Sequence, residues 1–127
     1  MCTLCHLVAR ASKRIVLVVE DDDETREAVT ATLESEGYRT VTASDGQDAL
    51  AVLGQVRPHV VLLDLMMPIV SGWEVLGAIQ TNPLLASLPV IVVSAYVDHA
   101  PGGVVRVIRK PFRSEDLLSA VAAAAQQ

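Results

Sequence analysis

His59-Val-Val-Leu-Leu-Asp64 places four consecutive aliphatic residues immediately before an aspartate. An apolar run of this length, without polar alternation, is typical of a strand that is buried on both faces, as the strands of parallel sheets are. Two further runs follow the same pattern, because Arg14–Val19 precedes Glu20 and Pro89–Val93 precedes Ser94. We therefore expect a parallel sheet whose buried strands end in polar residues.

Segments with helical periodicity alternate with these strands along the chain. Such an alternation predicts a doubly wound α/β domain, in which right-handed crossovers join parallel strands. We expect strands at residues 14–19, 38–43, 59–63, 89–93 and 104–108, and helices over 22–36, around Ala49–Leu53, over 73–80 and around Leu117–Val121. Since neither a linker nor an internal repeat interrupts the pattern, residues 13–127 are predicted to form one domain after a flexible tail at 1–12.

The composition limits the classes of function that the chain can serve. Hydrophobic residues make up 51% of the 127 residues and aromatic residues only 3%, so the core must be aliphatic. The formal net charge is −5 and no long run of Lys or Arg appears, which argues against direct binding of nucleic acid. No apolar stretch approaches the ~20 residues of a membrane span, and the first residues do not resemble a signal peptide. We therefore expect a cytoplasmic protein that does not associate with membranes.

Both cysteines lie in the predicted tail, where Cys2, Cys5 and His6 form a Cys-x-x-Cys-His pattern. This pattern occurs at attachment sites of c-type haem, which would require export and a haem-sized cavity. A zinc site would need about four ligands, and the other histidines, His59 and His99, are distant in the sequence. We interpret the pattern as part of the tail, without an assigned role.

The polar residues that follow the strands form a candidate site. Glu20-Asp21-Asp22 follows the first strand, Asp64 the third, Ser94 the fourth and Lys110 the fifth. Since the carboxyl ends of parallel strands share one edge of the sheet, these side chains should converge there. Taken singly, the acids are compatible with a favourable first helical turn and the serine with a turn. Together they favour a Mg²⁺ site, because the cation relieves repulsion between carboxylates while a lysine compensates a transferred phosphoryl group.

Four segments resemble the signature segments of bacterial response-regulator receiver domains, which act in two-component signalling. These segments are Val18-Val-Glu-Asp-Asp22, Val61-Leu-Leu-Asp-Leu-Met-Met-Pro68 with Gly72, Val93-Ser-Ala95 and Arg109-Lys-Pro-Phe112. The resemblance covers residues 13–125 and implies a five-stranded sheet in the flavodoxin-like order 2-1-3-4-5. It implies a phosphoacceptor rather than an enzyme, although one that assists its own phosphorylation and dephosphorylation. The implied partners are a sensor histidine kinase or phosphotransfer protein and an unidentified downstream protein.

The resemblance also implies how the acidic residues act. Asp64 is the phosphoacceptor, in a reaction that depends on Mg²⁺. Asp21 is a direct Mg²⁺ ligand, and Glu20 is its acidic partner, directly or through water. The backbone carbonyl of Met66 completes the protein ligands of the ion, together with Asp64.

Two further residues would contact the phosphoryl group itself. By the same resemblance, Ser94 forms a hydrogen bond with a phosphoryl oxygen and Lys110 pairs with it. A cis peptide bond between Lys110 and Pro111 would aim the lysine into the site. A carboxylate can be a covalent nucleophile, and Mg²⁺ with a lysine would stabilise the charge on the phosphoryl oxygens in the transition state.

Two features depart from the family's pattern and concern its output. Val107 stands three residues before the signature lysine, where receivers usually carry Tyr or Phe. The stretch between Ser94 and Lys110 is short and contains Pro101-Gly102-Gly103, so we expect a shortened or irregular fourth helix. These departures leave open a phosphorylation-independent interaction module on the same fold. A phosphohydrolase of the aspartyl-phosphate type is less favoured, because Met66 stands where such enzymes place a second aspartate.

Overall fold

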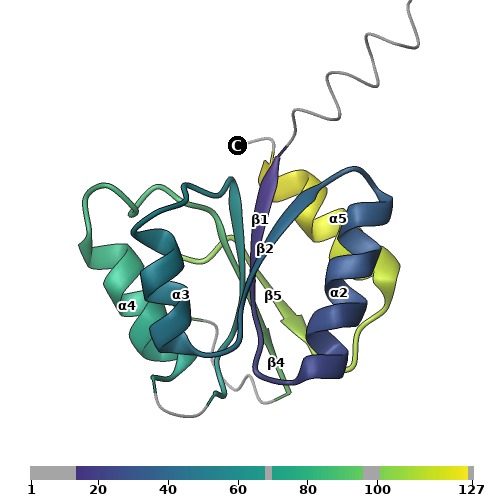
Figure 1. Cartoon of the computed structure of the whole chain (residues 1–127), viewed down its shortest axis with the longest axis horizontal. Helices are drawn as coiled ribbons and strands as arrows, with labels where there is room; N and C mark the ends of the chain where they lie inside the picture. The colour runs from purple at the N-terminus through teal and green to yellow at the C-terminus, as the bar shows by residue number, and fades with distance from the viewer. Residues whose placement is uncertain (1–13, 68–69, 96–100, 126–127) are drawn as a thin grey trace, which may run out of the picture.

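The computed structural model describes residues 14–67, 70–95 and 101–125. The predicted tail at 1–12, with Cys2, Cys5 and His6, lies outside this part of the chain. In chain order the elements are β1 (Ile15–Val19), α2 (Asp23–Ser35), β2 (Arg39–Ala43), α3 (Gly46–Leu53), β3 (Val60–Asp64), α4 (Gly72–Thr81), β4 (Val90–Ser94), β5 (Arg106–Arg109) and α5 (Ser114–Ala125). Strands and helices alternate as predicted, except that the described residues between β4 and β5 contain no helix (Figure 1).

The strands form one parallel sheet in the order β2-β1-β3-β4-β5, which confirms the predicted topology. Strands β2 and β5 are its edges. Helices α2 and α5 cover one face and α3 and α4 cover the other, as in a doubly wound fold (Figure 1). Within the described ranges, no helix is long and apolar enough to cross a membrane.

Side chains of the central strands alternate between two apolar cores. Val16 and Val18 of β1 face α2 and α5, whereas Leu17 and Val19 face α3 and α4. Every residue of β3 and β4 is buried as well, and Val107 of β5 is half-buried against the α3–α4 core. Because helices cover both faces, polar groups of these strands are confined to the strand ends.

All five strands begin one or two residues later than predicted. Strand β3 begins at Val60 rather than His59, although the His59 N–H donates to the Ile15 carbonyl at 2.8 Å and the Ile15 N–H donates to the His59 imidazole Nδ1 at 3.0 Å. Strand β5 begins at Arg106 rather than Val104, because regular pairing with β4 starts there. The periodicity of side chains predicts which residues are buried, but it does not report where backbone pairing starts.

The connection from β4 to β5 is irregular in the residues that the structure describes. Residues 101–105 contain no helix, and residues 96–100 lie outside the described ranges. Gly103 has a φ of 82°, and the side-chain amide of Gln80 in α4 donates to the Gly102 carbonyl at 2.6 Å. The sequence predicted that the fourth helix, between Ser94 and Lys110, is shortened or irregular. The described residues of this connection agree with that prediction.

Two glycines allow close backbone contacts around the segment that follows β3. A Cβ atom at Gly72 would lie 2.1 Å from the Asp64 carbonyl oxygen, and one at Gly46 would lie 2.1 Å from the Val70 carbonyl oxygen. Only glycine therefore allows α3 and α4 to begin this close to their neighbours. Gly77 in α4 differs, since a Cβ atom there would meet nothing within 4 Å.

We predict opposite effects of alanine at two of these glycines. Gly46→Ala must displace the Val70 backbone, so the free energy of unfolding should fall by about 1–3 kcal/mol. Gly77→Ala adds helix propensity without a clash, so the same quantity should rise by about 0.5–1 kcal/mol. Urea denaturation followed by circular dichroism measures both effects. A stabilising effect of Gly46→Ala would contradict the close contact.

Candidate functional site

The register of the sheet brings the predicted site residues to one edge. The pairing of β1 with β3 places Glu20, directly after β1, beside Asp64, the last residue of β3. The pairing of β4 with β5 sets Ser94, the last residue of β4, opposite Arg109, the last residue of β5. Lys110 follows, and its amide donates to the Ser94 carbonyl at 3.0 Å. Residues far apart in the sequence therefore meet at the carboxyl edge of the sheet.

Lys110 lies between two buried carboxylates. Its Nζ is 2.6 Å from Glu20 Oε1 and 3.4 Å from Asp64 Oδ2. Glu20 is 5% exposed and Asp64 is 4% exposed, so the ammonium compensates two charges that water reaches poorly. The peptide bond between Lys110 and Pro111 is cis, as the resemblance implied.

Three carboxylates could hold a metal ion. One oxygen each from Glu20, Asp21 and Asp64 lies within 4.8 Å of the others, and Asp21 is the exposed member of the set. Hard oxygen donors at this spacing fit Mg²⁺, which prefers carboxylates and water. The Met66 amide donates to Asp64 Oδ1 at 3.1 Å, so the Met66 backbone lies beside the cluster. A metal-binding role for its carbonyl stays a prediction.

The acidic segment after β1 has two features that the sequence analysis did not identify. Asp22 caps α2, because its carboxylate accepts the Thr25 N–H at 2.9 Å and the Thr25 hydroxyl at 2.6 Å. The guanidinium of Arg26 donates from Nη1 to the Glu20 carbonyl at 2.9 Å. The only signal for Arg26 in the sequence is that it is a basic residue two positions after Glu24, the last acid of the run.

Burial and nearby charges shift the pKa values of the site residues. Burial raises the pKa of Glu20 above its usual 4.5, the hydrogen bond from Lys110 opposes this rise, and the charge of Asp64 adds to it. Burial by itself would lower the pKa of Lys110, but the hydrogen bond with Glu20 and the charge of Asp64 raise it above the usual 10.5. The hydrogen bonds from Thr25 lower the pKa of Asp22. Lys110 is therefore held as an ammonium.

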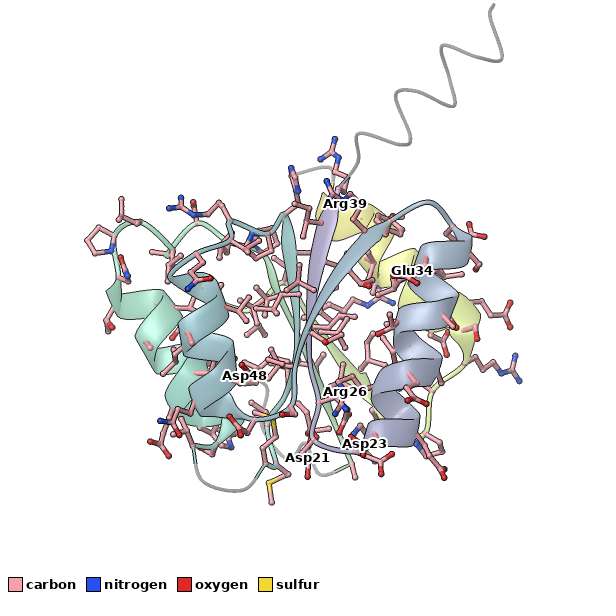
Figure 2. The ribbon with its side chains drawn as sticks, in the orientation of Figure 1. Asp21, Asp23, Arg26, Glu34, Arg39 and Asp48 are labelled. Carbon is pink, nitrogen blue, oxygen red and sulfur yellow. The ribbon has the colours of Figure 1, made fainter. Side chains whose placement is uncertain are left out.

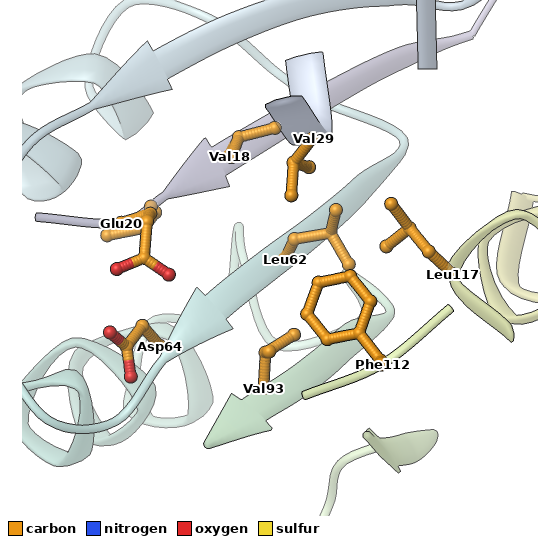
Figure 3. Close-up of a pocket in the computed structure, with 9 residues that line it drawn as sticks. Val18, Glu20, Val29, Leu62, Asp64, Val93, Phe112 and Leu117 are labelled. Atoms are coloured by element: carbon orange, nitrogen blue, oxygen red, sulfur yellow. The ribbon is translucent and has the colours of Figure 1, made fainter. Parts of the chain in front are cut away.

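A small cavity of about 20 Å³ adjoins the two buried carboxylates (Figure 3). Its volume suffices for about one water molecule. The residues that line it are mostly aliphatic: Val18, Val19, Val29, Leu62, Val93 and Leu117, with Phe112, Glu20 and Asp64. This apolar wall excludes most water from one side of Glu20, which explains why burial raises the pKa of that residue.

Comparison with known proteins gives relatives along most of the chain. Residues 16–122 match the family model of the response regulator receiver domain. PilG of Pseudomonas aeruginosa is 34% identical over 114 residues, which cover 85% of this chain and 84% of PilG. The DNA-binding response regulator MtrA of Mycolicibacterium smegmatis is 32% identical over 114 residues, which cover 85% of this chain and 49% of MtrA. This chain thus spans about half the length of MtrA, and the DNA binding in that name belongs to MtrA.

A solved structure supports the same relationship. The response regulator protein TrrA of Thermotoga maritima, in complex with Mg(2+)-BeF, matches this chain with a TM-score of 0.80. The two sequences are 29% identical, and the match covers 88% of this chain and 99% of TrrA. The structural similarity therefore extends over most of this chain and almost all of TrrA.

We predict that Asp64→Asn stabilises the metal-free protein. Two carboxylates about 5 Å apart repel by roughly 3 kcal/mol, and the substitution also removes one partner of Lys110, so we expect a net gain on the order of 1 kcal/mol. Such a gain raises the melting temperature of a domain of this size by roughly 4 °C. Calorimetry in a chelating buffer measures it. Added Mg²⁺ should raise the melting temperature of the parent more than that of the variant, and a parent indifferent to Mg²⁺ would contradict the clustered site.

Glu20→Gln should change the pH dependence of stability in a defined direction. Because the folded-state pKa of Glu20 is raised, the folded chain binds more protons at this group than the unfolded chain does above pH 4.5. The contribution of Glu20 to stability therefore falls as the pH rises from 4.5 through the folded-state pKa. The variant should gain free energy of unfolding relative to the parent over this window, as measured by urea denaturation without metal. A difference that is constant with pH would be inconsistent with the burial of Glu20.

Proposed function

The chain belongs to the response regulator receiver domain family, and we propose that Asp64 is the residue on which it accepts a phosphoryl group. The observation that carries this proposal is the position of Lys110, whose ammonium lies 3.4 Å from the Asp64 carboxylate and 2.6 Å from that of Glu20. A cation fixed beside a buried carboxylate can stabilise the negative charge that a phosphoryl group brings to that carboxylate.

In the proposed reaction a carboxylate oxygen of Asp64 attacks the phosphorus of the donor. An oxygen–phosphorus bond forms as the bond to the donor's leaving atom breaks, and the product is an acyl phosphate. Lys110 would pair with the phosphoryl oxygens as their charge develops, and the Ser94 hydroxyl would donate a hydrogen bond to one of them. Ser94 is fully buried at the end of β4, so its orientation is restricted by packing.

We propose that Mg²⁺ is the cofactor of this reaction. Asp21 and Asp64 would bind it directly, Glu20 directly or through water, and Met66 through its backbone carbonyl. When bound, the ion neutralises part of the charge of the acidic cluster and of the phosphoryl oxygens. The carboxylate spacing of 4.8 Å or less and the Mg(2+)-BeF complex of TrrA support this assignment.

The phosphoryl donor would be a sensor histidine kinase or a phosphotransfer protein, and a downstream protein would bind the phosphorylated form. A phosphoryl group adds roughly −1.5 to −2 charges at neutral pH, and this change would shift a conformational equilibrium that the partner reads. The chain would assist its own phosphorylation and dephosphorylation without acting as an enzyme on another substrate. We infer a cytoplasmic location from the family alone.

Incubation with Mg²⁺ and acetyl phosphate should add one phosphoryl group, detected as a mass increase of the intact protein. Asp64→Asn should abolish the adduct, because a neutral amide is a poor nucleophile. Lys110→Ala should slow its formation by roughly 100-fold, as expected for loss of one stabilising group in the transition state.

Asp116→Asn is a matched control, because Asp116 is an exposed acid in the first turn of α5 and lies outside the proposed site. This variant should be phosphorylated at the rate of the parent. An adduct on Asp64→Asn equal to that on the parent would refute the assignment of Asp64. The absence of any adduct on the parent would refute the phosphoacceptor function.

A further inference from the structure

Arg26 contacts the acidic segment after β1 at two points. From the first turns of α2 its Nη1 donates to the Glu20 carbonyl at 2.9 Å, and its Nη2 forms an ion pair with the Asp23 carboxylate. Its side chain is only 18% exposed, whereas that of Asp23 is 80% exposed. Figure 2 shows Arg26, Asp21 and Asp23 at the same end of the molecule. The guanidinium therefore spans the segment from the end of β1 to the start of α2.

We propose that Arg26 is a positioning residue that fixes residues 20–23, so that Asp21 and Glu20 present their carboxylates together to a divalent cation. This inference rests on the proposed Mg²⁺-dependent function. Arg26 is not itself a ligand in this proposal. It acts through the backbone of Glu20 and the side chain of Asp23.

The acidic segment needs such a contact because its own charges oppose its conformation. Like charges on successive residues repel, and an extended turn would separate them. Within the described residues the Asp21 carboxylate forms no hydrogen bond or ion pair, so its direction depends on the backbone that carries it. That backbone is held on one side by the Glu20 N–H, which donates to the Ala43 carbonyl at 3.0 Å. Arg26 holds the Glu20 carbonyl on the other side.

A second explanation of Arg26 makes the opposite prediction. If the guanidinium served only as a counter-charge to the acids, its removal would leave the cluster more negative and would strengthen the binding of a cation. If it positions the acids, its removal would weaken binding, because groups that orient metal ligands typically contribute at least tenfold to affinity. The sign of the change in Mg²⁺ affinity therefore separates the two explanations.

The experiment compares the Mg²⁺ affinity of the parent, Arg26→Gln and Arg26→Lys by isothermal titration calorimetry with MgCl₂. Arg57→Gln is the matched control, because Arg57 also donates from Nη1 to a backbone carbonyl, that of Leu84 at 3.2 Å, but away from the acidic cluster. The free energy of unfolding of each variant is measured without Mg²⁺, so that loss of stability is separated from loss of affinity.

We expect Arg26→Gln to bind Mg²⁺ about tenfold more weakly than the parent, and Arg57→Gln to bind it with unchanged affinity. Equal or tighter binding by Arg26→Gln would overturn the proposal. If Arg26→Gln does not fold, Arg26→Lys tests the proposal instead. A lysine keeps the positive charge but lacks the planar guanidinium, whose two nitrogens contact Glu20 and Asp23 at once. Weaker binding by Arg26→Lys would then support positioning, and unchanged binding would overturn it. A parent that neither binds Mg²⁺ nor becomes phosphorylated would instead refute the proposed function on which the inference rests.

Discussion

The site depends on one ammonium group that two buried carboxylates share. A buried charge without a partner costs several kcal/mol, and both Glu20 and Asp64 lie beside an apolar cavity. The register of the parallel strands brings these acids together, and Lys110 offsets the cost of doing so. The strand topology brings the two carboxylates together, and the charge of Lys110 Nζ compensates them. The site needs both. Any new anion at Asp64 would compete for the same ammonium, so chemistry at the carboxylate must rearrange this contact.

Adjacent acids of one segment have different tasks because their surroundings differ. Glu20 is buried against Lys110, whereas Asp21 is the exposed member of the three-carboxylate cluster. Asp22 forms the cap of α2, and Asp23 pairs with Arg26. The run of acids therefore contains both the start of α2 and part of the candidate site. The explanation as a favourable helix start is confirmed for Asp22 and Asp23, and the explanation as a metal site stays a prediction for Glu20 and Asp21.

Side-chain pattern predicted most of the fold, because a strand buried on both faces needs an unbroken aliphatic run such as that of β3. The strand order came from the resemblance to a family, since pattern alone does not rank the neighbours of a strand. The meeting of the candidate site residues could be predicted because each lies at the carboxyl end of a strand or just after it, and the parallel topology brings these ends to one edge. The contact of Arg26 with the Glu20 carbonyl and the bond from Ile15 to the His59 imidazole could not be predicted, because both depend on backbone geometry rather than on periodicity.

The borders of the sheet have a consequence for the protein in concentrated solution. Edge strands offer unpaired backbone groups to strands of other molecules, and aliphatic strands are prone to such aggregation. Strand β5 has only four residues, and exposed arginines, Arg106 and Arg109, stand at its two ends. The first residue of β2, the other edge strand, is the exposed Arg39. The positive charges on these edge strands repel the same charges on other copies of the chain. This repulsion protects a sheet with such aliphatic strands from pairing edge to edge with its neighbours.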